Sequence, residues 1–207
     1  MDIKFFSIDQ EKQDRILNAA LKEFAMKGYK NASTNEIVRE AGISKGLLFH
    51  YFKSKKDLYL FLFDHFVDIL IEKMKQEVNW KVRDIFVRNR EMAVVKMELF
   101  HEYPQVFDFF NGIFFEEDKD ISKELEYRKN EFLSKNYRDM MKDIDTSQFR
   151  EGVDIEKAVD IIAWSLEGFS NRIQAKVKGM NLQEINIEET LAQMDEYLNV
   201  LKNSFYK

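Results

Sequence analysis

The sequence predicts an all-α protein, and three observations lead to that fold class. The 207 residues include one proline and seven glycines, so long helices can run with few interruptions. Apolar residues recur at three- and four-residue spacing along most of the chain, which is the period of an α-helix. No segment alternates β-branched and polar residues over the length of a strand. We expect about nine helices, divided between residues 1–53 and 54–207.

The first predicted helix covers about residues 9–27, where apolar side chains form one stripe. Gly28 follows it, in the position where a left-handed glycine commonly ends a helix. The second helix is predicted to begin at Ser33, which with Glu36 has the spacing of a capping box. Gly42 is expected to end that helix after about two turns.

A third short helix is predicted at about residues 45–52, with Ser44 as its N-cap. The tight turn at Gly42 joins it to the second helix, which is the helix-turn-helix arrangement. A long helix is then predicted to begin at Ser54, because Ser54 and Asp57 have the spacing of a second capping box.

The rest of the chain is expected to continue as helices. Pro104 ends one of them, because the residue before a proline is pushed away from helical geometry. Asp154 and Gly179 mark the two ends of another. The expected helices cover about residues 81–102, 105–116, 119–144, 154–178 and 187–204.

The formal net charge is −5, but the charge is unevenly distributed. Residues 1–56 hold 11 lysines and arginines against 7 aspartates and glutamates, whereas the remaining residues hold 21 against 30. The excess of basic side chains in the N-terminal part favours a polyanionic partner for that part of the chain.

Several classes of functional site are missing from the sequence. Without cysteine, the chain has no disulfide, thiolate metal site or cysteine nucleophile. His50, His65 and His101 lack metal-ligand spacing, and no glycine-rich phosphate loop is present. We therefore expect neither an enzyme nor a cofactor. The first residues lack the pattern of a signal peptide and no apolar run reaches the length of a membrane span, so we expect a soluble cytoplasmic protein.

Residues 44–55 combine the groups that a helix needs in the major groove of DNA. Ser44 offers a hydroxyl at an open helix start, Lys45 a positive charge, and Gly46 a backbone that DNA can approach closely. The alternative is that the aromatic side chains only cover a small domain and that the lysines are solvated, and spacing alone leaves both interpretations open. The expected DNA contacts are Ser33, Thr34, Ser44, Lys45, Gly46, Leu47, Phe49, His50, Tyr51 and Lys55.

The segment GYKNASTNEIVREAGISKGLLFHYFKSKKDL, residues 28–58, resembles the N-terminal signature of the TetR family of bacterial transcriptional regulators. Two positions depart from the family pattern: Leu47 stands where a small polar residue is frequent, and Phe49 stands where tyrosine is commoner. Phe49 lacks the hydroxyl for a phosphate bond, whereas apolar contact with a thymine methyl is open to both side chains. The matching positions are Gly28-Tyr29, Ser33-Thr34, Ile37, residues 41–46, Tyr51-Phe52, residues 53–55 and Leu58.

The resemblance implies a homodimer whose recognition helices enter successive major grooves of a palindromic operator in double-stranded DNA. It also implies a helix-turn-helix DNA-binding domain in residues 1–53 and a helical ligand-binding and dimerisation domain in residues 54–207. A small apolar or aromatic effector would release this repressor from DNA by binding to the second domain. The alternative is a helix-turn-helix regulator that is controlled by a protein partner and has no small-molecule effector.

The last predicted helix carries apolar residues at alternating spacings of four and three, from Ile187 to Phe205. This is an a/d heptad pattern, and the helix at 154–178 offers a second apolar face. As in the resembled family, these helices are expected to contact a second copy of the chain, while the alternative is that they pack within one chain. The expected interface residues are Leu166, Phe169, Ile173, Leu191, Met194, Leu198 and Leu201.

Residues 100–115 include seven aromatic side chains. A short helix that is apolar nearly all round is buried on several sides, and its rings can line a pocket for a flat or apolar ligand. They can equally be plain core. The expected ligand contacts are Phe100, Phe107, Phe110, Asn111, Phe114 and Trp164.

Overall fold

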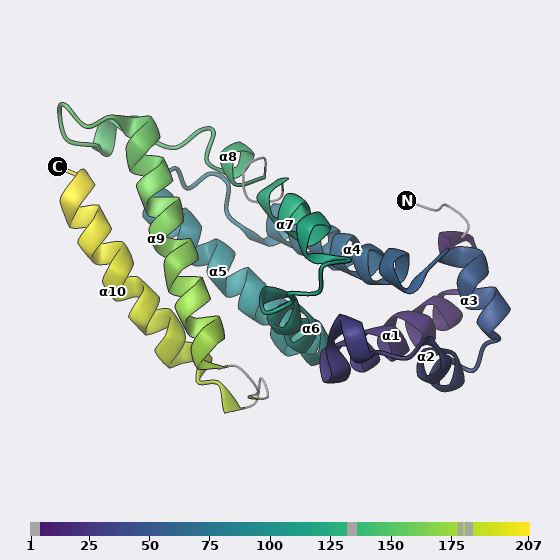
Figure 1. Cartoon of the computed structure of the whole chain (residues 1–207). Coiled ribbons are helices and arrows are strands. Elements are labelled where there is room, and N and C mark those ends of the chain that lie inside the picture. The colour runs from purple at the N-terminus through teal and green to yellow at the C-terminus, as the bar shows by residue number, and fades with distance from the viewer. Residues whose placement is uncertain (1–4, 132–135, 178–179, 181–183) are drawn as a thin grey trace. The chain divides into compact units, whose positions relative to one another are not determined.

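The computed structural model describes residues 5–131, 136–177, 180 and 184–207. Within these residues the regular secondary structure is helical, apart from one isolated β-bridge (Figure 1). The predicted all-α fold is confirmed. The α-helices are α1 Gln10–Asn31, α2 Thr34–Ala41, α3 Lys45–Tyr51, α4 Lys55–Glu77, α5 Ile85–Glu102, α6 Pro104–Phe114, α7 Ser122–Glu131, α8 Tyr137–Met140, α9 Ile155–Lys176 and α10 Ile187–Phe205.

Two glycines break the N-terminal helices where the sequence predicts breaks. Gly28 has φ 67° and ψ 173°, so the helical run of α1 is interrupted there before it continues to Asn31. Gly42 follows α2 with φ 65° and ψ 38°, which is the left-handed conformation. A residue with a Cβ adopts this conformation at a cost of about 1–2 kcal/mol. The tight turn between α2 and α3 therefore depends on glycine.

The starts of α3 and α4 are capped as predicted. The backbone N–H of Leu47 donates to Ser44 Oγ at 3.2 Å. At the start of α4, the N–H of Asp57 donates to Ser54 Oγ at 3.0 Å, and the Ser54 hydroxyl donates to the Asp57 carboxylate at 2.7 Å. Both caps satisfy N–H groups that the first turn of a helix leaves without an intrahelical partner.

The capping box predicted for Ser33 and Glu36 is wrong. The side chain of Ser33 makes no capping hydrogen bond, although Ser33 is the N-cap of α2. Its backbone N–H donates instead to Glu23 Oε1 of α1 at 2.8 Å, and the Glu36 carboxylate pairs with Arg39. A carboxylate from a different helix has replaced the expected local partner.

The helix predicted at 119–144 is described as two helices, and its continuity stays a prediction because the residues between them lie outside the described part of the chain. Helix α7 begins at Ser122, whose N–H donates to the Asp118 carbonyl at 2.8 Å. Helix α8 ends at Met140, and residues 132–135 between the two helices lie outside the described residues. Helices α5, α6, α9 and α10 match their predicted ranges to within a few residues.

The chain divides into two compact packing units, each with its own core. One comprises residues 1–71 and 102–132, and the other comprises residues 72–101 and 133–207. The functional domains expected from the sequence, with their boundary after residue 53, stay a prediction.

The core of the first unit joins α1, α4 and α6 through aromatic rings. The Tyr59 ring of α4 lies 4.8 Å from the Phe24 ring of α1 and 5.0 Å from the Phe109 ring of α6, between ring centroids. All three side chains are buried. Edge-to-face rings at this spacing add stabilisation beyond that of the buried area. Helix α6 is thereby fixed to the first helix of the chain.

The second unit contains a fully buried cation, Arg88 of α5. Its guanidinium donates to the Met140 carbonyl at 2.8 Å, to the Val82 carbonyl at 2.6 Å and to the Asp143 carboxylate at 2.7 Å. A buried charge is tolerated when it is paired and its donors are satisfied. Arg88 therefore ties the segment before α5 to the end of α8 and to the segment that follows α8.

Candidate nucleic-acid interface

The first turn of α3 is exposed to solvent in the head, the name used here for helices α1–α3. Ser44, Lys45 and Gly46 are exposed, and a Cβ added at Gly46 would meet no atom within 4 Å. Among the described residues the Lys45 ammonium has no hydrogen-bond or ion-pair partner. Leu48, by contrast, is 1% exposed. Helix α3 thus presents backbone, hydroxyl and free charge on one side and packs its apolar side inward.

The beginning of α2 supplies two further hydroxyls. The side chains of Ser33 and Thr34 are half-buried and, within the described chain, neither hydroxyl has a hydrogen-bond partner. Because the Ser33 side chain does not cap its own helix, its hydroxyl is available to an external acceptor. Hydroxyls at a helix start are common phosphate ligands in protein–DNA complexes.

Tyr51 lies at the end of α3, and its ring is core. The side chain is 8% exposed and contacts the rings of Phe5 and Phe52. Its hydroxyl has no partner among the described residues, yet it is not among the polar atoms sealed from solvent. The phenol oxygen is therefore the one part of Tyr51 that can reach a phosphate.

Lys55 already has protein partners. Its ammonium donates to the carbonyls of Lys30 at 3.1 Å and of Ala32 at 3.2 Å, and it lies 4.8 Å from the centroid of the Tyr29 ring. A lysine has three N–H donors, so one donor is left for a phosphate. The first role of Lys55 in this structure is to hold the last turn of α1 against the start of α4.

The remaining DNA candidates share no single environment. His50 is exposed, whereas Leu47 and Phe49 are half-buried. The structure therefore places all ten predicted DNA contacts on the starts of α2 and α4 or along α3, with their polar atoms accessible to different degrees. None of these assignments is tested by a bound nucleic acid, and each stays a prediction.

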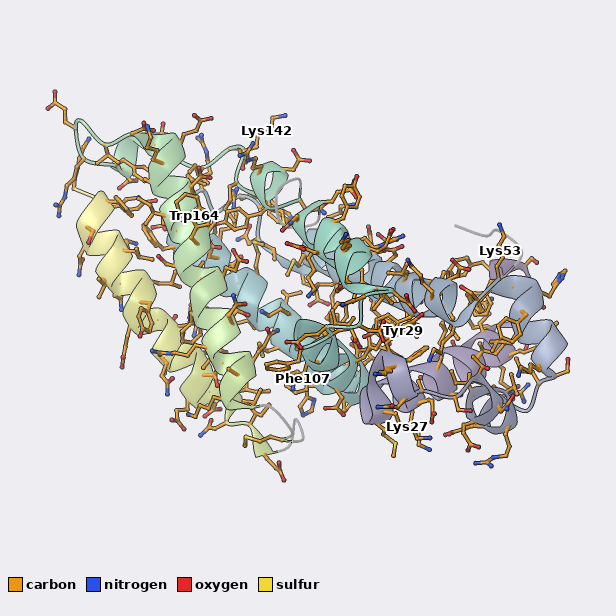
Figure 2. All side chains as sticks on the ribbon, in the orientation of Figure 1. Lys27, Tyr29, Lys53, Phe107, Lys142 and Trp164 are labelled. Carbon is orange, nitrogen blue, oxygen red and sulfur yellow. The ribbon has the colours of Figure 1, made fainter. Side chains whose placement is uncertain are left out.

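The expected ligand residues fall into both packing units. Phe107, Phe110 and Asn111 lie on α6 in the first unit (Figure 2 labels Phe107), and the Oδ1 atom of Asn111 is buried without a hydrogen-bond partner among the described residues. Phe100 and Trp164 belong to the second unit, and Trp164 is 65% exposed on α9 (Figure 2). The side chain of Phe114 lies outside the described residues. The three α6 residues therefore form the coherent part of this set.

Most of the expected dimer residues lie in the core of the second unit or pack against it. Met194 and Leu198 are buried, and Leu166, Phe169, Leu191 and Leu201 pack against the same cluster. Ile173 is half-buried. Two of the seven side chains are thus buried and five are half-buried, and their role in a dimer interface stays a prediction.

Sequence reasoning missed a group of exposed apolar side chains on the same two helices. Helices α9 and α10 lie antiparallel and side by side (Figure 1). The available signal was the pair Ile161 and Trp164, which lie three residues apart on α9 and outside the set expected at the interface. The large exposed side chains are Ile161 and Trp164 on α9, and Tyr197 and Val200 on α10.

No helix in the described part of the chain is both long enough and apolar enough to span a membrane.

Burial, together with the nearby carboxylates of Asp120 and Asp118, raises the pKa of the Tyr29 phenol above its usual value. That phenol lies at the end of α1, beside the loop that follows α6.

Comparison with known proteins gives matches of two kinds. A family model described as bacterial regulatory proteins of the TetR family matches residues 16–61. The HTH-type transcriptional regulator YerO of Bacillus subtilis is 38% identical over 65 residues, which is 31% of this chain and 22% of that protein. For the first two curated relatives, the match spans about a fifth of the relative's length.

Other matches extend over most of the chain. The fatty acid metabolism regulator protein of Bacillus subtilis is 25% identical over 164 residues, covering 74% of this chain and 78% of that protein. The crystal structure of Bacillus subtilis FadR in complex with stearoyl-CoA has a TM-score of 0.66 at 18% identity, covering 91% of this chain and 96% of that one. A TetR family regulator from Chloroflexus aurantiacus has a TM-score of 0.61 at 19% identity, covering 99% and 98%. Residues 16–61 therefore match the model of the TetR family of bacterial regulatory proteins, and the fold of the chain is similar to that of a solved TetR family regulator.

Proposed function

We propose that this protein is a homodimeric DNA-binding transcriptional regulator, which represses transcription and leaves a palindromic operator when a small apolar molecule binds to the helices that follow the head. The observation that supports DNA binding best is the open first turn of α3. There the capped Ser44, the unpaired Lys45 ammonium and the bare Gly46 backbone stand together on an exposed helix start. The free hydroxyls of Ser33 and Thr34 at the start of α2 would bind the flanking phosphates.

The test of DNA binding uses the DNA upstream of the protein's own gene. Operator affinity is expected to fall steeply between about 50 and 200 mM salt, because each lysine or arginine at a phosphate releases a counterion. Lys45→Ala should weaken operator binding by about tenfold and reduce sequence discrimination. Lys142→Ala, at an exposed lysine outside the head (Figure 2), is the matched control and should bind like wild type. Absence of binding even at low salt would end the proposal.

The proposed dimer would cover the exposed apolar face of α9 and α10. Trp164 and Val200 are 65% and 64% exposed, and large apolar side chains gain about 1.5–3 kcal/mol each when they are buried. The residues expected at the interface from the sequence lie on the same two helices and mostly pack in or against the core of the second unit. In the proposed dimer these residues form the layer that underlies the interface. The exposed side chains that contact the second copy are Ile161, Trp164, Tyr197 and Val200.

The proposed effector site is centred on α6. A buried amide oxygen without a partner costs about 1–3 kcal/mol, so the Asn111 side chain is a polar group that a ligand could satisfy among aromatic neighbours. One similar protein is named as a regulator of fatty acid metabolism, and a similar solved structure, FadR, contains stearoyl-CoA. We therefore propose long-chain acyl-CoA as the first effector class to test.

Helix α6 is also placed to pass a ligand's effect to the head. The Phe109 ring contacts Tyr59 and lies 6.5 Å from the Phe24 ring of α1. Just after α6, Glu116 Oε2 accepts the backbone N–H of Tyr29 at 3.1 Å, next to the break at Gly28. A ligand that shifts α6 would therefore shift α1 with it, provided that the ligand binds one of the two arrangements more tightly.

The effector test measures operator release by stearoyl-CoA, with stearate and with coenzyme A alone as comparison compounds. Asn111→Leu keeps the side-chain volume but removes the amide, and it should shift the concentration for half-release at least about threefold without changing operator affinity in the absence of ligand. Asn130→Leu, at an exposed asparagine of α7, is the control. If no acyl compound releases the operator, acyl-CoA is excluded, and the alternative of control by a protein partner takes its place.

A further inference from the structure

The N-terminal 3₁₀ turn η1, Phe5–Ser7, packs against the buried side of the recognition helix α3. The Phe5 side chain has no exposed surface. Its ring centroid lies 5.7 Å from that of Tyr51, 5.0 Å from that of Phe52 and 5.4 Å from that of Phe61 on α4. Phe5 is therefore wedged between the end of α3 and the first turns of α4.

The backbone of this turn is anchored to α1. Gln13, which is 6% exposed, donates through Nε2 to the Ile8 carbonyl at 2.8 Å and to the Phe6 carbonyl at 3.4 Å. A buried amide that satisfies backbone acceptors fixes the path of the chain before α1. The position of the Phe5 ring is thus set from both sides, by the rings in front of it and by Gln13 behind.

The orientation of the Tyr51 ring depends on packing. No hydrogen bond holds the Tyr51 hydroxyl among the described residues, so the ring contacts alone direct it. Phe5 meets the Tyr51 ring edge to face at an interplanar angle of 73°, and His50 contacts it at 5.4 Å. A side chain that is already oriented before binding loses less rotational freedom when it binds.

We propose that Phe5 is a positioning residue for DNA binding, which holds the Tyr51 ring so that its hydroxyl meets a phosphate of the operator. The inference rests on the proposed function, which assigns Tyr51 to a phosphate contact. It assigns a role in DNA recognition to a residue that precedes the helix-turn-helix and touches no DNA. A residue that only fills the core would change the stability of the head and leave the operator affinity of the folded protein unchanged.

A double-mutant cycle separates these two roles. Operator dissociation constants are measured by fluorescence anisotropy for wild type, Phe5→Leu, Tyr51→Phe and the double variant, at a temperature where circular dichroism shows all four to be folded. Tyr51→Phe should weaken binding about tenfold, as expected for a lost hydrogen bond to a charged group. Phe5→Leu should weaken binding about fivefold in the wild-type background and less than about twofold in the Tyr51→Phe background, because the hydroxyl it positions is then missing.

Phe6→Leu is the matched control, since Phe6 lies in the same turn but is 40% exposed, and among the described residues its ring does not contact that of Tyr51. It should bind like wild type. If Phe5→Leu is not folded at the assay temperature, Phe5→Met takes its place in the cycle. The proposal is overturned if the Phe5 variant weakens binding equally in both backgrounds, if it binds like wild type, or if Tyr51→Phe has no effect. A wild-type protein that binds no operator would instead refute the proposed function itself.

Discussion

The head and the α9–α10 pair present opposite kinds of surface. At the start of α3 the exposed groups are a hydroxyl, an unpaired ammonium and bare backbone. On α9 and α10 the exposed groups are large apolar side chains, including Trp164 and Val200. The first surface suits a polyanion such as DNA, because a lysine that neutralises a phosphate releases a counterion and so favours binding. The second suits another protein surface, because groups of exposed large apolar side chains commonly mark interfaces.

The contrast leads to different dependences on conditions. Binding through the head should weaken with salt, since surface charges are screened within about 8–10 Å at physiological ionic strength. Association through α9 and α10 should be insensitive to salt and sensitive to single polar substitutions, since it gains from buried apolar area. Variants that exchange or abolish these behaviours show whether the two surfaces are correctly assigned.

The largest expected effect comes from a core position of α10. Leu198 is 5% exposed, so Leu198→Asp buries a charge without a partner and should lower the free energy of unfolding by about 3–5 kcal/mol. Urea unfolding followed by circular dichroism measures this. Asn199→Asp introduces the same charge at the neighbouring exposed position and should change stability by less than about 0.5 kcal/mol. From the heptad pattern alone, Leu198→Asp is expected to give folded monomers, and that outcome would restore the interpretation of Leu198 as an interface residue.

The next effect concerns the exposed face of the same pair. Trp164→Glu should leave the subunit folded and convert the dimer to monomers in sedimentation equilibrium. Operator affinity should then fall about 100-fold or more, because two linked heads bind far more tightly than one. Tyr127→Glu is the control, since Tyr127 is equally exposed, at 66%, on α7. A Trp164→Glu protein that remains dimeric would move the interface away from α9.

The two regions also differ in how far sequence alone predicted them. In the head, the ends of a helix follow from local sequence, so the N-cap at Ser44 and the helix end at Gly42 were predicted correctly. On α10 the heptad pattern shows that the helix is amphipathic, but it does not say whether its apolar side meets the same chain or another. Met194 and Leu198 meet their own chain.

The failures have a common physical cause, which is a partner distant in sequence. Ser33 and Glu36 have the spacing of a capping box, but Glu23 of α1 takes the backbone N–H that the box would satisfy. Phe5 lies before the first periodic stretch, so nothing local marks it as core. Its burial depends on rings that are about 45 to 55 residues away along the chain. Local sequence signals were enough to predict the helix ends of the head, whereas the environments of Ser33 and Phe5 depend on contacts that are distant in sequence.

The smallest effect comes from comparing the two serines at N-cap positions in the head, Ser44 of α3 and Ser33 of α2. Ser44 Oγ accepts the Leu47 N–H, whereas the Ser33 hydroxyl caps nothing. Ser44→Ala should therefore cost about 1 kcal/mol of local stability, and Ser33→Ala only a few tenths. Hydrogen exchange measures this difference directly: amides of α3 in Ser44→Ala should exchange about fivefold faster, while those of α2 in Ser33→Ala should exchange less than about twofold faster. Both variants should still bind the operator more weakly, because each loses a hydroxyl assigned to phosphate. Equal acceleration of exchange in both variants would mean that Ser33 does cap α2 in solution, and its hydroxyl would then no longer be free for DNA.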